Sequence, residues 1–153
     1  MDHEFGTNQL TEQQVGWDWF SVQLDNGVEL MLYRMRLRDG GIDPHSSGSI
    51  IEPDSRKTRL DANKFQAIPQ RAWQSSKTGT SYPIEWLLKI PTQNAELRVI
   101  AEMDDQELVT TRSTGIAYWE GAVRIEGTWR GRPVRGKGYL ELTGYAERFR
   151  PRV

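Results

Sequence analysis

The sequence predicts an all-β fold, an antiparallel up-and-down β-barrel of about eight strands. Aromatic side chains make up 10% of the residues, and 14 glycines are spread along the chain. Apolar and polar residues alternate with a period of two in many segments, whereas no long stretch keeps the spacing of an amphipathic helix. Turn signals rich in Gly, Asn, Asp and Pro separate these segments, which is typical of consecutive antiparallel strands.

The first hairpin is the clearest local prediction. "WDWFSVQL" (17–24) runs into "DNG", a strong turn signal, and "VELMLYRMRL" (28–37) follows. In the second strand Met31, Tyr33 and Met35 share one face, which we expect to point inward, and the arginines share the other. "DGG" at 39–41 ends this strand, and "SGSIIEP" predicts a further short strand.

The middle and end of the chain continue the pattern. "DANKFQAIPQRAW" is ambiguous, because Asp61 is a possible cap for one helical turn before Pro69 stops it. "YPIEWLLKIP" and "AELRVIAEM" each present one apolar face, expected to be inward; the residues are Ile84, Trp86, Leu88 and Ile90, then Leu97, Val99, Ala101 and Met103. "AYWEGAVRIEGTW" and "RPVRGKGYLELTGYAE" predict a last hairpin around the turn "RGRP".

Closure of such a sheet into a barrel would remove both of its edges. A barrel of about eight strands has an interior that is either filled or able to hold one small ligand. Residues 1–16 are expected to be an extended lead-in, and residues 17–153 to form the barrel.

Composition excludes several classes of function. The net charge of −1 and the pI of about 6.1 provide no basic field for nucleic acid. The chain lacks cysteine and has two histidines, so we expect no metal site and no cofactor. The apolar runs are too short to span a bilayer. The basic stretch "RGRPVRGK" is expected to be a solvated loop with at most a peripheral contact to lipid headgroups.

Aromatic residues suggest a binding surface. Trp17 and Trp19 share one face of the first strand, and Asp18 and Phe20 share the other. The tryptophans fit either core packing with an interface to a partner barrel, or an aromatic wall that grips a long apolar ligand. Together with Trp86 and the methionines Met31 and Met35, they are our candidate ligand-binding residues.

Two glutamates in the last hairpin are further candidates. Tyr118 shares a face with Glu120, and Tyr139 shares a face with Glu141. If the opposite, apolar side points inward, the glutamates are solvated; if the tyrosines line the interior, the glutamates become buried acid–base groups. Paired glutamates also occur in glycoside hydrolases, but sequence spacing does not give their separation. A serine hydrolase is disfavoured, because the chain has no G-x-S-x-G motif.

"YWEGAVRIEG" followed by "GRPVRGKGYLELTGY" resembles the C-terminal signature of the AttH/CrtC family, which includes carotenoid 1,2-hydratases (hydroxyneurosporene synthases) and bacterial proteins labelled as secreted hydrolases. "MDHEFG", "GWDWFSVQLDNGVELMLYRMR" and "KTGTSYPIEWLLKIP" fit the same pattern. The resemblance implies two lipocalin-like barrels in tandem, of which this chain is the second, with the N-terminal barrel as its partner. It also implies a periplasmic or secreted location.

The resemblance implies a catalytic set as well. The hydratases carry a His-x-Trp and a Tyr-x-Asp pattern, whose acid protonates an isolated double bond. His3 and Tyr33 match these patterns, whereas Phe5 and Met35 replace the Trp and the Asp. A thioether cannot donate a proton, so Glu4 or Asp18 would have to supply the acid.

Three functions follow from these observations. The first is binding or carriage of an apolar molecule, a lipid or isoprenoid, which needs an open apolar site. The second is hydration of an isoprenoid double bond, which needs a proton donor beside that site. The third is a purely structural barrel, which predicts an interior filled by Trp17 or Trp19, Trp86 and the methionines.

Overall fold

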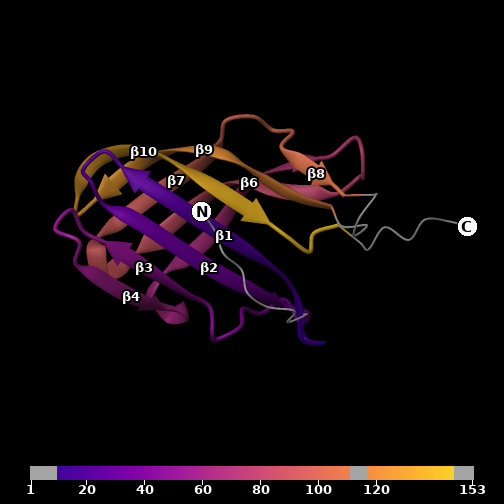
Figure 1. Cartoon of the computed structure of the whole chain (residues 1–153), viewed down its shortest axis with the longest axis horizontal. Coiled ribbons are helices and arrows are strands. Elements are labelled where there is room, and N and C mark those ends of the chain that lie inside the picture. Colours follow the sequence, from indigo (N-terminus) through magenta and orange to yellow (C-terminus); the bar gives the residue numbers. More distant parts are fainter. Residues whose placement is uncertain (1–9, 111–116, 147–153) are drawn as a thin grey trace, which may run out of the picture.

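A computed structural model describes residues 10–110 and 117–146 of the chain. These residues form ten β-strands and two short 3-10 turns (Figure 1). In chain order they are β1 (Gln14–Leu24), β2 (Glu29–Leu37), β3 (Ser47–Ile51), β4 (Lys57–Asp61), η1 (Ala62–Lys64), β5 (Gln66–Gln74), β6 (Ser81–Ile90), η2 (Pro91–Gln93), β7 (Ala95–Ala101), β8 (Glu107–Val109), β9 (Ala117–Trp129) and β10 (Arg132–Leu142).

All ten strands belong to one antiparallel sheet with the order β4-β3-β2-β1-β10-β9-β7-β6-β5, and β8 pairs with β9. The first strand pairs with the last, as in an up-and-down barrel. The sheet curls so that its two halves face each other (Figure 1), and Phe20 of β1 meets Trp86 of β6 edge to face, with ring centroids 5.3 Å apart. The predicted all-β antiparallel fold is confirmed, with ten strands instead of about eight.

The ring of strands is open between β4 and β5. These strands follow each other in the chain, yet they form the two ends of the sheet within the described residues. The prediction that closure removes both edges was therefore wrong, and the structure is a half-barrel. Two local features explain the gap: the 3-10 turn Ala62–Lys64 separates the strands, and Pro69 within β5 lacks the N–H that pairing on a second side requires.

The core fills the space between the two halves of the sheet. Trp86, Trp119, Tyr82 and Phe20 are its largest fully buried side chains. The inward face predicted for β6 is confirmed, because Ile84, Trp86, Leu88 and Ile90 are all buried. The inward prediction for Met103 was wrong: its exposed fraction is 63%, because β7 ends at Ala101 and the alternation does not continue.

The two faces of β2 are the reverse of the prediction. Leu30 and Leu32 are buried, whereas Met31 is 36% exposed. Arg34 and Arg36 therefore point inward, and Met31, Tyr33 and Met35 point outward. Alternation separates two faces without saying which is inside. Here Leu30 and Leu32 pair in register with Val22 and Phe20 of β1, which are also buried, so their apolar area decides the orientation.

The predicted hairpin turns are confirmed. Gly27 of the "DNG" turn has a φ of 83°, and the Val28 N–H donates to Asn26 Oδ1 at 3.1 Å. In the β9–β10 turn both central residues, Arg130 and Gly131, have positive φ angles of 51° and 75°. That pattern is a type I′ turn, whose twist matches the flanking strands.

Candidate functional site

The outer face of four neighbouring strands, β2, β1, β10 and β9, gathers most of the side chains that the sequence singled out. They are Met31, Tyr33 and Met35 of β2, Trp17 and Trp19 of β1, Tyr139 and Glu141 of β10, and Tyr118 and Glu120 of β9. We call this set the aromatic face. All nine side chains are half-buried or exposed. The candidate residues therefore meet, but on the outside of the half-barrel and not in an interior cavity.

One row of residues crosses this face. Tyr33 lies opposite Trp19, Trp19 lies opposite Glu141, and Glu141 lies opposite Glu120 in the strand register. Trp17 lies two residues further along β1, with its ring centroid 6.4 Å from that of Tyr33. The sheet thus places an aromatic ridge directly beside two carboxylates.

The two carboxylates are direct cross-strand neighbours. Side chains in such positions have Cβ atoms about 4.5–5.5 Å apart, and like charges there destabilise a sheet. Partial burial, followed by the charge of Glu120, raises the pKa of both Tyr118 and Tyr139. Negative charge is therefore concentrated next to partly desolvated rings, which is an arrangement suited to proton transfer at an apolar molecule.

A hollow of about 310 Å³ adjoins the row. Ser21, Tyr139 and Ala122 are among the residues that line it. They lie two residues along their strands from Trp19, Glu141 and Glu120, respectively. Its size is at the lower end of the range for small-molecule sites.

The inner side of the same strands carries a buried charge cluster. Asp18 is fully buried, and the Nε and Nη2 atoms of Arg34 donate to its Oδ2 at 2.9 and 2.8 Å. Arg36 Nε lies 3.2 Å from Asp18 Oδ1 as an ion pair. The Tyr145 hydroxyl donates to Asp18 Oδ1 at 2.7 Å. The carboxylate is thus surrounded by groups that hold it in place, as a buried charge requires.

Both arginines extend this cluster. Arg34 Nη1 donates to the carbonyl of Ala67 on β5 at 2.6 Å, and its guanidinium lies 4.9 Å from the centroid of Trp86. Arg36 lies 3.7 Å from the centroid of Tyr145 and donates to the carbonyl of Thr143. Arg34 therefore spans the gap in the half-barrel, from β2 to β5.

A second buried carboxylate belongs to Glu107 of β8. The hydroxyls of Thr78 and Tyr82 donate to its Oε1 at 2.6 and 2.9 Å, and the Ser75 hydroxyl donates to its Oε2. The ring of Tyr82 lies 5.9 Å from that of Tyr145. Two aromatic rings therefore connect the Asp18 cluster with Glu107 along the inner side of the sheet.

Replacing Tyr145 by Phe is expected to change the response to alkaline pH. Burial, followed by the charge of Asp18, raises the pKa of the Tyr145 hydroxyl above its usual value near 10. As the pH rises, this hydroxyl loses its proton in the unfolded chain before it does so in the folded protein. Its contribution to the free energy of unfolding is therefore complete below about pH 10 and is lost as the pH rises further. In urea unfolding between about pH 8 and pH 11, the free energy of unfolding should fall less steeply with pH for Tyr145→Phe than for the wild type. Equal slopes for the two proteins would contradict this.

The structure separates the predicted catalytic residues. Asp18 points inward, whereas Tyr33 points outward from the neighbouring strand. Trp86 belongs to the core, apart from the aromatic face. His3 and Glu4 lie outside the described residues. No three metal-ligating side chains gather within the described ranges, and no helical turn there is long or apolar enough to cross a bilayer.

Sequence reasoning missed the inward arginines. A signal was present, because the "DNG" turn fixes the hairpin register and that register places Asp18 opposite Arg34. A carboxylate and a guanidinium in cross-strand positions predict an ion pair. Tyr145 and Glu107 had no comparable local signal, because their partners are distant in the chain.

Fold and site together define a curled antiparallel half-barrel with an aromatic, acidic outer face. The chain belongs to the AttH-like family, whose model matches residues 1–145. The AttH part of the resemblance seen in the sequence is therefore confirmed.

Two curated relatives carry enzyme names. Kievitone hydratase of Fusarium solani subsp. phaseoli is 27% identical over 143 residues, which cover 92% of this chain and 39% of the relative. Dehydratase asqC of Emericella nidulans is 22% identical over 149 residues, covering 92% of this chain and 40% of the relative. The chain thus spans about two fifths of the length of these relatives. Their names support a hydratase-like function in the family.

Solved structures support the same fold. A crystal structure of an AttH protein of Nitrosomonas europaea superimposes with a TM-score of 0.79 at 32% identity, covering 92% of this chain and 42% of that one. Kievitone hydratase of Nectria haematococca superimposes with a TM-score of 0.72 at 19% identity, covering 90% and 42%.

Proposed function

We propose that this chain is part of a hydro-lyase, an enzyme that adds water to, or removes water from, an unsaturated apolar small molecule such as an isoprenoid. The observation that carries the proposal is the row Tyr33, Trp19, Glu141 and Glu120 on the aromatic face. It combines a surface for an apolar molecule with a pair of carboxyl groups. The hydratase and dehydratase names of the two relatives support the same reaction class.

The chemistry needs one proton donor and one acceptor. In hydration, a protonated carboxyl group of the Glu120–Glu141 pair gives its proton to one alkene carbon, and the π electrons form the new C–H bond. Water then adds to the resulting carbocation, and the other carboxylate takes the proton that water releases. Dehydration is the reverse sequence. The ring faces of Trp19 and Tyr33 stabilise the positive charge that develops between these two steps.

Carriage of an apolar ligand without reaction is the second candidate. It needs the aromatic face and the adjoining hollow, but it gives no role to the two glutamates. The carboxylate pair therefore favours the enzyme. The buttress function predicted an interior filled by Trp17 or Trp19, Trp86 and the methionines. Trp86 does fill the interior, together with Trp119 and Phe20, whereas Trp17, Trp19 and Met31 remain outside. We further propose that an N-terminal barrel, in an exported protein, covers part of the aromatic face.

One experiment separates these functions. The full-length protein is incubated with a panel of prenylated and isoprenoid alkenes in deuterated water, and the products are followed by mass spectrometry. A product that gains one water and carries deuterium on carbon supports the hydro-lyase. A molecule that binds and is recovered unchanged supports carriage. Absence of both binding and conversion across the panel contradicts any function in which this face holds a ligand.

Replacing Glu141 by Gln is expected to lower turnover by about 10²-fold or more, because it removes one of the two proton-transfer groups. Binding of the alkene should change little, since the amide keeps the size of the side chain. Replacing Trp19 by Ala should instead weaken binding. Glu126 is a matched control, because it also lies on the outer face of β9 but forms an ion pair with Arg98. The variant Glu126→Gln should leave turnover unchanged. Equal turnover of Glu141→Gln and wild type would exclude the proposed role.

A further inference from the structure

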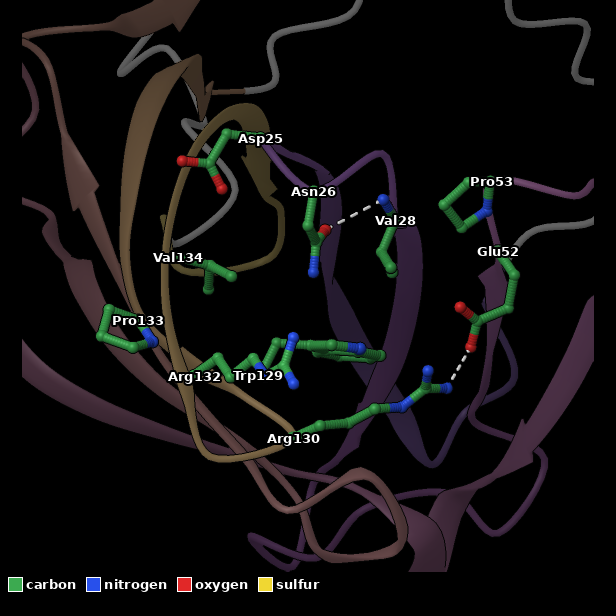
Figure 2. A pocket seen from close by; sticks show the side chains of 10 residues that line it. All are labelled: Asp25, Asn26, Val28, Glu52, Pro53, Trp129, Arg130, Arg132, Pro133 and Val134. Atoms are coloured by element: carbon green, nitrogen blue, oxygen red, sulfur yellow. Dashed lines mark hydrogen bonds and ion pairs between the residues drawn. The ribbon is translucent and has the colours of Figure 1, made fainter.

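A second pocket lies at the end of the half-barrel, where three hairpin turns meet. It has a volume of about 600 Å³ (Figure 2). Asp25, Asn26 and Val28 come from the β1–β2 turn, Glu52 and Pro53 follow β3, and the β9–β10 hairpin contributes Trp129, Arg130, Arg132, Pro133 and Val134. Asp25, which follows the end of β1, lies six residues after Trp19 in the chain. Six residues of extended strand span roughly 20 Å, so the pocket is separate from the aromatic face.

The acidic residues of this pocket already have partners. Glu52, whose side chain is 11% exposed, forms an ion pair of 2.5 Å with Arg130 Nη2 (Figure 2). Asp25 Oδ1 accepts the backbone N–H of Arg135 at 3.2 Å. Asn26 Oδ1 accepts the N–H of Val28. Asp25, Glu52 and Asn26 thus each have one side-chain oxygen engaged within the protein.

Two donors of the wall are not engaged. The side chain of Arg132 makes no hydrogen bond or ion pair within the described part of the chain, and Figure 2 shows it extending towards the middle of the pocket. The indole Nε1 of Trp129 is buried and has no acceptor among the described residues, although Trp129 is only 3% exposed. Buried donors of this kind nearly always have a partner, in the protein or bound to it. The pocket therefore has a surplus of donors.

Arg130 is held in an unfavourable backbone conformation beside this pocket. Its φ of 51° belongs to the left-handed region, which is strained for a residue other than Gly. Asn, Asp or Gly is the usual choice at this turn position. Hydrogen bonds from Arg130 Nε and Nη2 to Gln93 Oε1, at 3.2 and 3.0 Å, fix its guanidinium in addition to Glu52. The neighbouring Arg132 is left as the guanidinium able to bind an external group.

We propose that this pocket binds a small molecule that carries a carboxylate on an apolar body, with Arg132 as its charged contact. The planar guanidinium matches a carboxylate with two parallel hydrogen bonds. Val28, Val134 and the two prolines provide an apolar wall for the remainder of the molecule. Because two acids balance two arginines in this wall, a monoanion fits better than a doubly charged phosphate. The proposal does not depend on the reaction at the aromatic face.

The test is an NMR titration of the full-length, ¹⁵N-labelled protein with 2-naphthoate. The indole resonance of Trp129, assigned with Trp129→Phe, should shift in a saturable manner. The neutral, isosteric 2-naphthamide should bind about tenfold more weakly or not at all, and inorganic phosphate should bind more weakly than 2-naphthoate. Saturation by 2-naphthamide with equal affinity would show that the pocket does not recognise charge. Phosphate binding as tight as that of 2-naphthoate would show that it does not recognise the apolar body.

Replacing Arg132 by Gln should weaken 2-naphthoate binding at least tenfold and leave 2-naphthamide unaffected. Arg135 is the matched control, because it lies on the same strand and its side chain does not line the pocket. Arg135→Gln should bind 2-naphthoate like the wild type. Unchanged affinity of Arg132→Gln, with a wild-type spectrum, would overturn the proposal, as would a complete absence of saturable shifts with 2-naphthoate.

Discussion

Replacing Asp18 by Asn is expected to lower the free energy of unfolding by about 3–5 kcal/mol, the usual cost of removing one partner from a buried ion pair. Asp18 is fully buried, and the side chains of Arg34 and Arg36 are only 16% and 17% exposed. The amide would leave two guanidinium groups without a counter-charge in an environment that poorly solvates them. Since small domains have a total stability of about 5–15 kcal/mol, the variant would be close to unfolding.

Urea denaturation followed by circular dichroism measures this effect. Asp104→Asn is a suitable control, because Asp104 also pairs with an arginine, Arg71, but its side chain is 46% exposed. Exposed pairs contribute about 0–1 kcal/mol, so the control should differ little from the wild type. If Asp18→Asn and Asp104→Asn lose similar amounts of stability, the inner cluster does not hold the fold together.

Replacing Trp86 by Ala should cost a comparable amount, about 3–5 kcal/mol, because it removes a large buried side chain and leaves a cavity. Trp86 is 1% exposed and packs edge to face on Phe20. Its indole N–H donates to the Pro83 carbonyl at 2.6 Å, and its ring lies under the Arg34 guanidinium. The substitution therefore removes contacts between both halves of the sheet.

Thermal and urea unfolding of Trp86→Ala and Trp86→Phe provide the measurement. Phe keeps much of the volume and the ring contact with Phe20, so it should lose clearly less stability than Ala. Addition of indole should partly restore Trp86→Ala if a dry cavity remains. Equal stability of the Ala and Phe variants would show that the ring at this position does not determine core packing.

Local patterns were sufficient for the strands and their turns. The "DNG" and "RGRP" turns, the buried face of β6 and the antiparallel order all depend on neighbours close in sequence, so alternation and turn chemistry predict them. The hairpin register, which follows from the same turn, also contained the pairing of Asp18 with Arg34. Residue types and spacing predict eight of the nine residues of the aromatic face as site candidates, and the family resemblance implies Tyr33; the structure brings them together.

Their placement on the outside was not predictable in the same way. Met31 and Leu30 are both apolar, and a period of two assigns them to opposite faces without choosing the inner one. The gap between β4 and β5, and the contact of Arg34 with Ala67 across it, depend on how strongly the sheet curls. Gly138 illustrates this curl, because a Cβ at that position would lie 2.1 Å from the Ser21 carbonyl oxygen of β1.

An all-β chain, its hairpins and the residues that share each face follow from local sequence patterns. Contacts between distant strands determine which face becomes the core, where the ring of strands opens, and that Tyr145 and Arg36 meet Asp18 across the sheet. The two groups of features differ in the range of the interactions that produce them. Turn conformation and alternation act over a few residues, whereas burial of apolar area and pairing of buried charges are settled between strands far apart in the chain.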